Sequence, residues 1–292
     1  MKNLIKHLKL KRRGIALLAG VHFYGNPSAK LKIIGVTGTN GKTTTATLLY
    51  RITSALGYKA GLISTVENII NGEVIVNLDN RPIPGTTPDP IFLHKLLNKM
   101  VENGCEYVFM EVSSHALDQS RVAGIIFTGG IFTNLTHDHL DYHKNIDNYF
   151  GAKKFFFKML PARAFALSNI DDEYGRKILE GIKARKFSYG LKDFPSFKKN
   201  FRGEITRLDF SGLELKIQSP SGETAVKSKL LGQFNAYNLL AVWSACNLLG
   251  FDMKKVNKIL ENIDPPRGRF EHFTSQNGVL VIVDYAHTPD AL

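Results

Sequence analysis

A glycine- and threonine-rich turn between a strand-like and a helix-like run carries the strongest chemical signal in this sequence. The turn consists of Gly38, Thr39, Asn40, Gly41, Lys42, Thr43 and Thr44. Backbone N–H groups at such a helix start bind phosphate, a lysine there reaches the β- and γ-phosphates, and a neighbouring hydroxyl binds Mg²⁺. The general phosphate-loop pattern has a glycine where this chain has Val36, so the match is incomplete. We therefore expect a nucleotide phosphate at this turn, with Lys42 on the phosphates and Thr43 on Mg²⁺.

Two further polar segments follow apolar runs and are candidates for the same site. Glu111 lies at the end of the run 107–112, and the segment 134–143 is rich in histidine and aspartate. Parallel α/β sheets bind ligands at the carboxyl ends of their strands, so both segments are expected beside the turn. The histidine and aspartate spacing does not separate zinc from magnesium, but a phosphate loop favours Mg²⁺ and ATP. A helix cap or a salt bridge is an equally good interpretation of Glu111 alone, and the spacing gives Lys153 no role.

The order of the elements predicts the fold class. Strand-like and helix-like segments alternate from residue 31 to residue 168, which indicates a mostly parallel sheet flanked by helices. Residues 66–82 predict a hairpin that turns at Asn71-Gly72. Alternating residues in 203–231 predict a small antiparallel β subdomain, and helices are expected over 236–249 and 253–262. The predicted class is an α/β phosphate-loop domain with this antiparallel addition.

Composition limits the classes of protein. The 292 residues suggest about two domains, and the formal net charge is +12, with basic runs at the N-terminus and in 183–202. Basic runs are usually solvated, and no interleaved aromatic motif or nucleic-acid module predicts a nucleic-acid partner. No apolar run reaches the ~18 residues that span a bilayer, so no membrane partner is expected. The two cysteines, Cys105 and Cys246, form no metal or disulfide pattern, which favours the cytoplasm.

Several motifs in a fixed order make a more specific match. They are Thr37-Gly38-Thr39-Asn40-Gly41-Lys42-Thr43-Thr44, Thr86-Thr87-Pro88, Met110-Glu111-Val112-Ser113-Ser114-His115-Ala116-Leu117, Asn134-Leu135-Thr136-His137-Asp138-His139-Leu140-Asp141-Tyr142-His143, Ala152-Lys153, Gly268-Arg269-Phe270-Glu271 and Asp284-Tyr285-Ala286-His287-Thr288-Pro289-Asp290. In this order they resemble the Mur ligase family, most closely the members that add the third residue of the muramyl peptide. The resemblance runs from about Tyr24 to the end of the chain.

The resemblance implies roles for individual residues. ATP would be bound by Gly38, Thr39, Asn40, Gly41, Lys42, Thr43 and Thr44, and Asn235 and Asn238 would belong to an asparagine-containing segment on the ATP side. Thr43 would bind one Mg²⁺ ion, Glu111 and His139 would bind a second, and Lys153 would be carbamylated. Thr86, Thr87, Ser113, Gln119 and Arg121 would contact UDP-MurNAc-L-Ala-D-Glu, while Lys42, Lys153 and His139 would serve catalysis. Asp284 and His287 would belong to the linker strand before a C-terminal domain.

The implied reaction is an ATP-dependent amide ligation. The D-Glu carboxylate attacks the γ-phosphate of ATP to give an acyl phosphate, and the amine of a diamino acid then displaces phosphate through a tetrahedral intermediate. Lysine and meso-diaminopimelate are the candidate amino acids. Phosphoryl transfer depends on positioning and charge neutralisation, which Lys42 and Mg²⁺ would provide.

The resemblance also implies a domain division. Residues 1–31 would be an N-terminal remnant containing a helix, 32–266 the central ATP-binding domain, and 267–292 the linker and the start of a C-terminal ligase domain. The chain is expected to lack most of the family's flanking domains, as a fragment or as a reduced protein with a partner chain that supplies the C-terminal domain.

Two alternatives stay open. One is a folylpolyglutamate synthetase or cyanophycin-type ligase of the same superfamily, against which the Ser113-Ser114-His115 run and the segment 138–143 argue. The other is a non-catalytic nucleotide-binding module, which the short chain favours. The presence of Lys42, Glu111 and Lys153 argues against it, because a scaffold does not need them.

Overall fold

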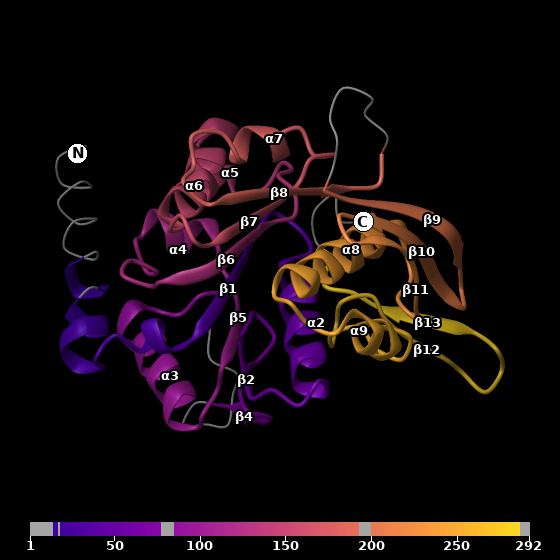
Figure 1. The fold of residues 1–292 in the computed structure, drawn as a ribbon, viewed down its shortest axis with the longest axis horizontal. Coiled ribbons are helices and arrows are strands. Elements are labelled where there is room, and N and C mark those ends of the chain that lie inside the picture. The colour runs from indigo at the N-terminus through magenta and orange to yellow at the C-terminus, as the bar shows by residue number, and fades with distance from the viewer. Residues whose placement is uncertain (1–13, 17, 77–84, 193–199, 287–292) are drawn as a thin grey trace.

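The computed structural model describes residues 14–16, 18–76, 85–192 and 200–286. Its centre is one large sheet in the order β11-β10-β9-β8-β7-β6-β1-β5-β2-β3-β4 (Figure 1). These strands are β1 (Lys32–Thr37), β2 (Ala60–Ile63), β3 (Asn68–Ile70), β4 (Glu73–Ile75), β5 (Tyr107–Glu111), β6 (Phe127–Phe132), β7 (Phe165–Asn169), β8 (Arg185–Gly190), β9 (Phe201–Asp209), β10 (Gly212–Ser219) and β11 (Gly222–Ser228). A second sheet pairs β12 (Glu271–Thr274) with β13 (Leu280–Val283).

The middle of the large sheet is parallel. Strands β8, β7, β6, β1, β5 and β2 pair in parallel with their neighbours, which confirms the predicted mostly parallel α/β sheet. Strand β1 lies between β5 and β6, and the chain leaves it in one direction to reach β2 and later returns on the other side to form β6. The loops after β1, β5 and β6 therefore meet at one edge, where sheets of this kind bind ligands.

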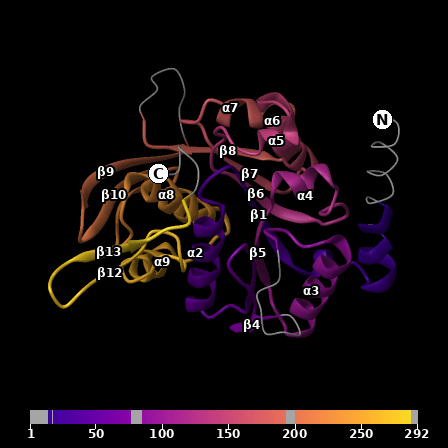
Figure 2. The same cartoon turned by 180° about the vertical axis from the view of Figure 1, so that it is seen from behind.

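Helices cover both faces of the sheet. They are η1 (Ala19–Phe23), η2 (Pro27–Lys30), α2 (Lys42–Ala55), α3 (Pro90–Glu102), α4 (Ser114–Asp118), α5 (Leu140–His143), α6 (Ile146–Met159), α7 (Gly175–Ile178), α8 (Gln233–Leu248) and α9 (Met253–Leu260). Ile34 of β1 packs in the core that contains residues of α2, α8 and α9, whereas Ile33 packs in the core that contains residues of α3 and α6. The two-residue period of a strand produces this division, and the two helical groups are visible in Figures 1 and 2.

Antiparallel strands extend the sheet at both ends. At one end β3 and β4 form the predicted hairpin, whose turn residues Asn71 (φ 48°) and Gly72 (φ 92°) have the positive φ values that a tight hairpin turn requires. Residues 77–82 of that prediction lie outside the described residues. At the other end the predicted antiparallel strands β9, β10 and β11 continue the same sheet, because β9 pairs in parallel with β8 at Tyr189 and Phe201.

Side-chain caps set where two of the helices begin. Helix α3 starts at Pro90, because a proline at the first helical position needs no hydrogen-bond acceptor. The Asp89 carboxylate accepts the Ile91 and Phe92 N–H groups there, both at 3.1 Å. Asn145 caps α6 in the same way and so fixes the helix that carries Lys153.

The described part of the chain contains no helix that combines the length and the apolar character needed to cross a bilayer. Cys105 and Cys246 are both buried free thiols.

Candidate active site

The turn between β1 and α2 is hydrogen-bonded to the residues that follow β6. The Asn134 side-chain oxygen accepts the Asn40 N–H at 2.8 Å, and the Thr133 hydroxyl donates to the Asn40 carbonyl at 2.6 Å. Gly41 has φ 83°, and a Cβ there would lie 2.3 Å from the Asn238 side-chain oxygen of α8. Both the backbone conformation and the close approach of Asn238 therefore require glycine at this position.

Two lysines converge on the loop. Lys42 Nζ donates to the carbonyls of Gly38 at 3.0 Å and Thr39 at 2.6 Å, and Lys153 Nζ of α6 donates to the Gly38 carbonyl at 2.6 Å. Burial lowers the pKa of both lysines, and the neighbouring Lys42 charge lowers that of Lys153 further, well below its usual value. Lys153, which is 1% exposed, thus has an increased neutral fraction, the form that reacts with CO₂.

Glu111 lies at the end of β5 and is 1% exposed. Its Oε1 accepts the Thr43 hydroxyl at 2.9 Å and the Thr65 N–H at 2.7 Å, and its Oε2 accepts the Thr65 hydroxyl at 3.2 Å. Hydroxyl and amide groups of the phosphate loop and of the segment after β2 are thus the hydrogen-bond partners of this carboxylate. The pair of Thr43 and Glu111 offers the hard oxygen ligands that Mg²⁺ prefers.

His139 belongs to the lining of the pocket described below, and its backbone is left-handed, with φ 54°. Its Nε2 is 3.5 Å from the Asp138 carboxylate, and its ring meets that of His115 edge-on at 4.9 Å. Burial lowers the pKa of His139, against the opposing effect of Asp138. Among the described residues no group of three or more His, Cys, Asp or Glu side chains could hold a metal by itself.

The residues predicted to contact the muramyl substrate form one connected network. The Thr87 hydroxyl donates to the Glu111 carbonyl at 2.9 Å and accepts the Ser113 N–H at 3.1 Å. Arg121 donates to the Thr87 carbonyl at 2.7 Å and makes two bonds to the Gln119 side-chain oxygen, at 2.7 and 3.0 Å. Of the five predicted residues, Thr86 alone lines the pocket described below. The structure thus brings the set together next to Glu111.

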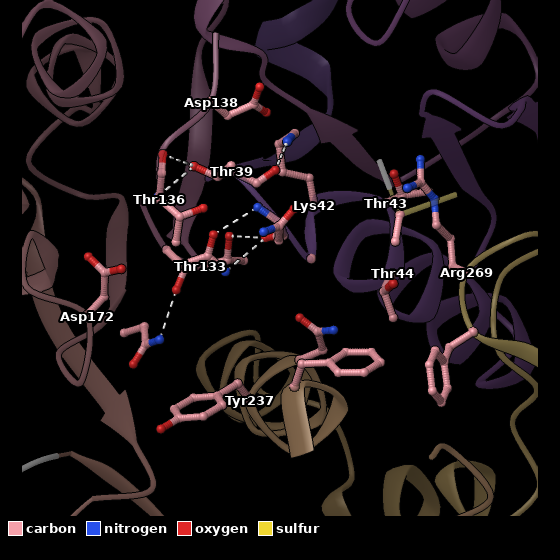
Figure 3. Close-up of a pocket in the computed structure, with 18 of the residues that line it drawn as sticks. Thr39, Lys42, Thr43, Thr44, Thr133, Thr136, Asp138, Asp172, Tyr237 and Arg269 are labelled. Carbon is pink, nitrogen blue, oxygen red and sulfur yellow. Dashed lines mark hydrogen bonds between the residues drawn. The ribbon is translucent and has the colours of Figure 1, made fainter. Parts of the chain in front are cut away.

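A pocket of ≈ 970 Å³ opens in front of the phosphate loop (Figure 3). Its described lining carries five carboxylates, which are Glu111, Asp138, Asp171, Asp172 and Asp284, against three fixed cations, which are Lys42, Lys192 and Arg269. The far wall is aromatic: Phe234 of α8 and Phe270 meet edge-to-face at 4.9 Å. This pocket therefore joins a polar, acidic floor to an apolar wall.

Comparison with known proteins assigns the family. The model of the Mur ligase middle domain matches residues 36–246. The chain belongs to the Mur ligase family. This agrees with the resemblance that the motifs indicate.

Individual Mur ligases are similar over most of this chain. A protein of Parabacteroides distasonis named UDP-N-acetylmuramoyl-L-alanyl-D-glutamate--2,6-diaminopimelate ligase is 52% identical over 270 residues, covering 92% of this chain and 53% of its own length. The chain thus spans about half the length of the curated relatives it matches. A solved structure with the same enzyme name has a TM-score of 0.77 at 28% identity, covering 94% of this chain and 56% of its own. A ligase structure titled as MurF from Thermotoga maritima in complex with ADP shares the fold, with a TM-score of 0.67 at 17% identity over 98% of this chain and 58% of its own.

Some residues of this Mur ligase site have no role predicted from the sequence. Thr65 follows β2 and contacts Glu111, Asp172 follows β7, and Arg269 and Tyr237 line the pocket (Figure 3). Glu111 was located as a polar residue at the end of a strand. The same rule, applied to every strand, would also have located Thr65 and Asp172. No local signal marks Tyr237, because it is one of several aromatic residues on an apolar helix.

Proposed function

We propose that this chain is the nucleotide-binding part of an ATP-dependent acid–amino-acid ligase of peptidoglycan precursor synthesis. The acceptor would be UDP-MurNAc-L-Ala-D-Glu and the incoming substrate a diamino acid, meso-diaminopimelate by analogy with the named relatives. The observation that carries the proposal is the convergence of Lys42, Lys153 and the Thr43–Glu111 pair on a single phosphate loop. Similarity to relatives named for this reaction supports it.

The protein groups would act by position and charge. Backbone N–H groups of the loop and the start of α2 would hold the phosphates, and Lys42 would leave its contacts with the Gly38 and Thr39 carbonyls to reach the γ-phosphate. The D-Glu carboxylate would attack that phosphate in line, and the amine would then attack the acyl phosphate. Thr86, Thr87, Ser113, Gln119 and Arg121 would orient the muramyl substrate. Asn40, Asn235 and Asn238 would position the nucleotide.

Mg²⁺ would be the cofactor, with one ion at Thr43 and a second at Glu111 and His139. Two observations support this: the pocket lining carries more carboxylates than lysine and arginine side chains, and the Glu111 carboxylate accepts the Thr43 hydroxyl at the start of α2. A divalent ion would neutralise the phosphate charge in such an environment. Lys153 would carry a carbamate, whose negative charge would lie beside that ion.

The remaining proposals concern the whole protein. Residues 1–31, 32–266 and 267–292 would be the N-terminal segment, the central ATP-binding domain and the linker into a ligase domain. The separate sheet of β12 and β13 supports a boundary near residue 267. The relatives carry further sequence outside the matched region. For this protein, the same polypeptide or a partner chain would supply the corresponding parts. A reaction that consumes ATP and a chain with free, buried cysteines fit a cytoplasmic location.

The test is substrate-dependent ATP hydrolysis by the purified chain, with and without a separately supplied C-terminal domain of a relative. We expect phosphate release that needs UDP-MurNAc-L-Ala-D-Glu and Mg²⁺ and that falls by at least ~100-fold in Lys42→Ala, since one phosphate-binding charge is lost. Lys95→Ala, on an exposed position of α3, is the matched control.

Two results would contradict the proposal. Hydrolysis stimulated by a folate rather than by the muramyl dipeptide would favour the folylpolyglutamate alternative. No hydrolysis even with the supplied domain, together with retained nucleotide binding, would favour a non-catalytic nucleotide-binding module.

A further inference from the structure

Tyr149 of α6 lies at the junction of three parts of the candidate site. It is 1% exposed, and its hydroxyl oxygen is 3.1 Å from the Thr39 hydroxyl of the phosphate loop. Its ring centroid is 4.3 Å from Lys153 Nζ, one helical turn further along α6. The same ring meets that of His139 edge-on at 6.0 Å. None of the roles proposed above uses this residue.

The hydroxyl of Tyr149 holds the phosphate loop through Thr39. Thr39 Oγ1 accepts the Thr136 N–H at 3.0 Å and lies 3.4 Å from the Thr136 carbonyl. Donation of the Thr39 proton to that carbonyl leaves its oxygen to accept the Tyr149 hydroxyl at 3.1 Å, and this arrangement gives every one of these protons an acceptor. Burial raises the pKa of the Tyr149 phenol, which keeps this donor protonated. The Thr39 carbonyl in turn accepts Lys42 Nζ at 2.6 Å. One buried phenol therefore ties α6 to the loop after β1 and, through Thr39, to the loop after β6.

The ring of Tyr149 confines Lys153. The amino group lies between the Gly38 carbonyl, at 2.6 Å, and the aromatic face. An ammonium group is attracted to such a face, and a neutral amine in the same place loses its freedom to rotate away from the loop. The ring thus fixes the position of Nζ whichever form it has.

We propose that Tyr149 is a positioning residue with two separable actions: its hydroxyl sets the phosphate loop through Thr39, and its ring holds Lys153 Nζ beside that loop. The inference rests on the proposed function, which assigns phosphate binding to the loop and a carbamate to Lys153. Carboxylation of Lys153 joins Nζ to the carbon of CO₂, moves one C=O electron pair onto oxygen and releases one proton to solvent. Tyr149 contributes no atom to this step and acts by placing the nitrogen.

Two readouts that need no muramyl substrate separate these actions. One is the ADP dissociation constant by calorimetry, and the other is the carbamate carbon resonance of the 292-residue chain titrated with ¹³C-bicarbonate. Tyr149→Phe keeps the ring, so we expect the resonance to be unchanged and the ADP dissociation constant to rise about fivefold, as for one lost buried hydrogen bond. Tyr149→Leu and the longer Tyr149→Met lose the ring, so half-maximal resonance is expected to need roughly threefold or more bicarbonate.

Tyr58→Phe is the matched control, because Tyr58 stacks on Phe251 and does not line the pocket. A merely structural tyrosine would shift both readouts in parallel in all three Tyr149 variants, and this result would overturn the proposal. Wild-type ADP affinity in Tyr149→Phe would overturn the hydroxyl action. A wild-type bicarbonate response in the variants that lack the ring, or no resonance in the wild-type chain, would overturn the ring action. Failure of the proposed function would appear separately, as absent dipeptide-dependent hydrolysis alongside intact ADP and carbamate responses.

Discussion

At the scale of single residues, the charged groups of the site are hydrogen-bonded to polar groups of the protein. Lys42, Lys153 and Glu111 satisfy their hydrogen bonds with loop carbonyls, hydroxyls and amides rather than with one another. Burying an ionised group costs free energy even when it has such partners, and for lysine this cost lowers the pKa. The chemistry proposed for these residues depends on this cost, because a lowered pKa increases the neutral, nucleophilic fraction of a lysine.

The lowered pKa of Lys153 predicts a pH-dependent stability difference between the wild-type chain and Lys153→Met. Between the folded pKa and the unfolded value near 10.5, the unfolded chain binds a proton that the folded chain does not, so wild-type stability rises with pH there. Methionine does not titrate. The free energy of unfolding of Lys153→Met relative to wild type should therefore be highest at low pH and decline towards pH 10.5, by about 1.4 kcal/mol for each unit of pKa depression. Urea unfolding in CO₂-free buffers from pH 6 to 10.5 measures this difference, and a constant difference would contradict the prediction.

At the scale of elements, what could be predicted from the sequence depended on how local each signal was. The hairpin at Asn71-Gly72 and the strand end at Glu111 are encoded by adjacent residues, and the structure places both as predicted. Lys153 lies in the middle of a helix, and the Gly38 carbonyl that it contacts is 115 residues away. Only the resemblance to a family gave it a role. The pairing of β8 with β9 is likewise a tertiary contact, and the hydrophobic periodicity of the two segments does not predict it.

The packing of η1 on α3 gives a prediction at the same scale. A Cβ at Gly20 would lie 2.6 Å from the His94 ring, and His94 is fully buried on α3 with no room to withdraw. Gly20→Ala should therefore loosen η1 and cost about 1–3 kcal/mol of local stability. The amide of Asn26, which donates to the Gly20 carbonyl at 2.6 Å, is a direct probe by hydrogen exchange.

Gly14→Ala is the control for this substitution, because nothing lies within 4 Å of a Cβ at Gly14. Equal Asn26 exchange rates in Gly20→Ala and Gly14→Ala would show that the close approach to His94 does not hold η1 in place.

At the scale of the whole molecule, charge is distributed unevenly. The chain has a formal net charge of +12, yet the described pocket lining carries more carboxylates than fixed cations. The positive field outside would attract an anionic nucleotide, and the acidic floor inside would require that its phosphates arrive with a cation. The pocket also draws on distant parts of the chain: its loop comes from β1, and its far wall from the segment that leads into β12 and follows β13.

Arg51 connects these distant parts, which gives the last prediction. From the C-terminal half of α2, its guanidinium donates to the carbonyls of Asp264 at 2.8 Å and Pro265 at 3.2 Å. The segment that follows brings Arg269 and Phe270 to the pocket wall. Arg51→Ala should therefore release that wall and weaken ADP binding by roughly three- to tenfold, the loss expected for one or two hydrogen bonds. Calorimetric titration measures the change in ADP affinity. Arg163→Ala is the control, since exposed Arg163 lies just before the amino end of β7, whereas the pocket lies at the carboxyl ends of the strands. Because Arg51 holds the backbone just before the wall segment, faster amide exchange over 268–286 should accompany the weaker binding. Unchanged affinity in Arg51→Ala would show that the wall is held by Phe234 and Phe270 instead.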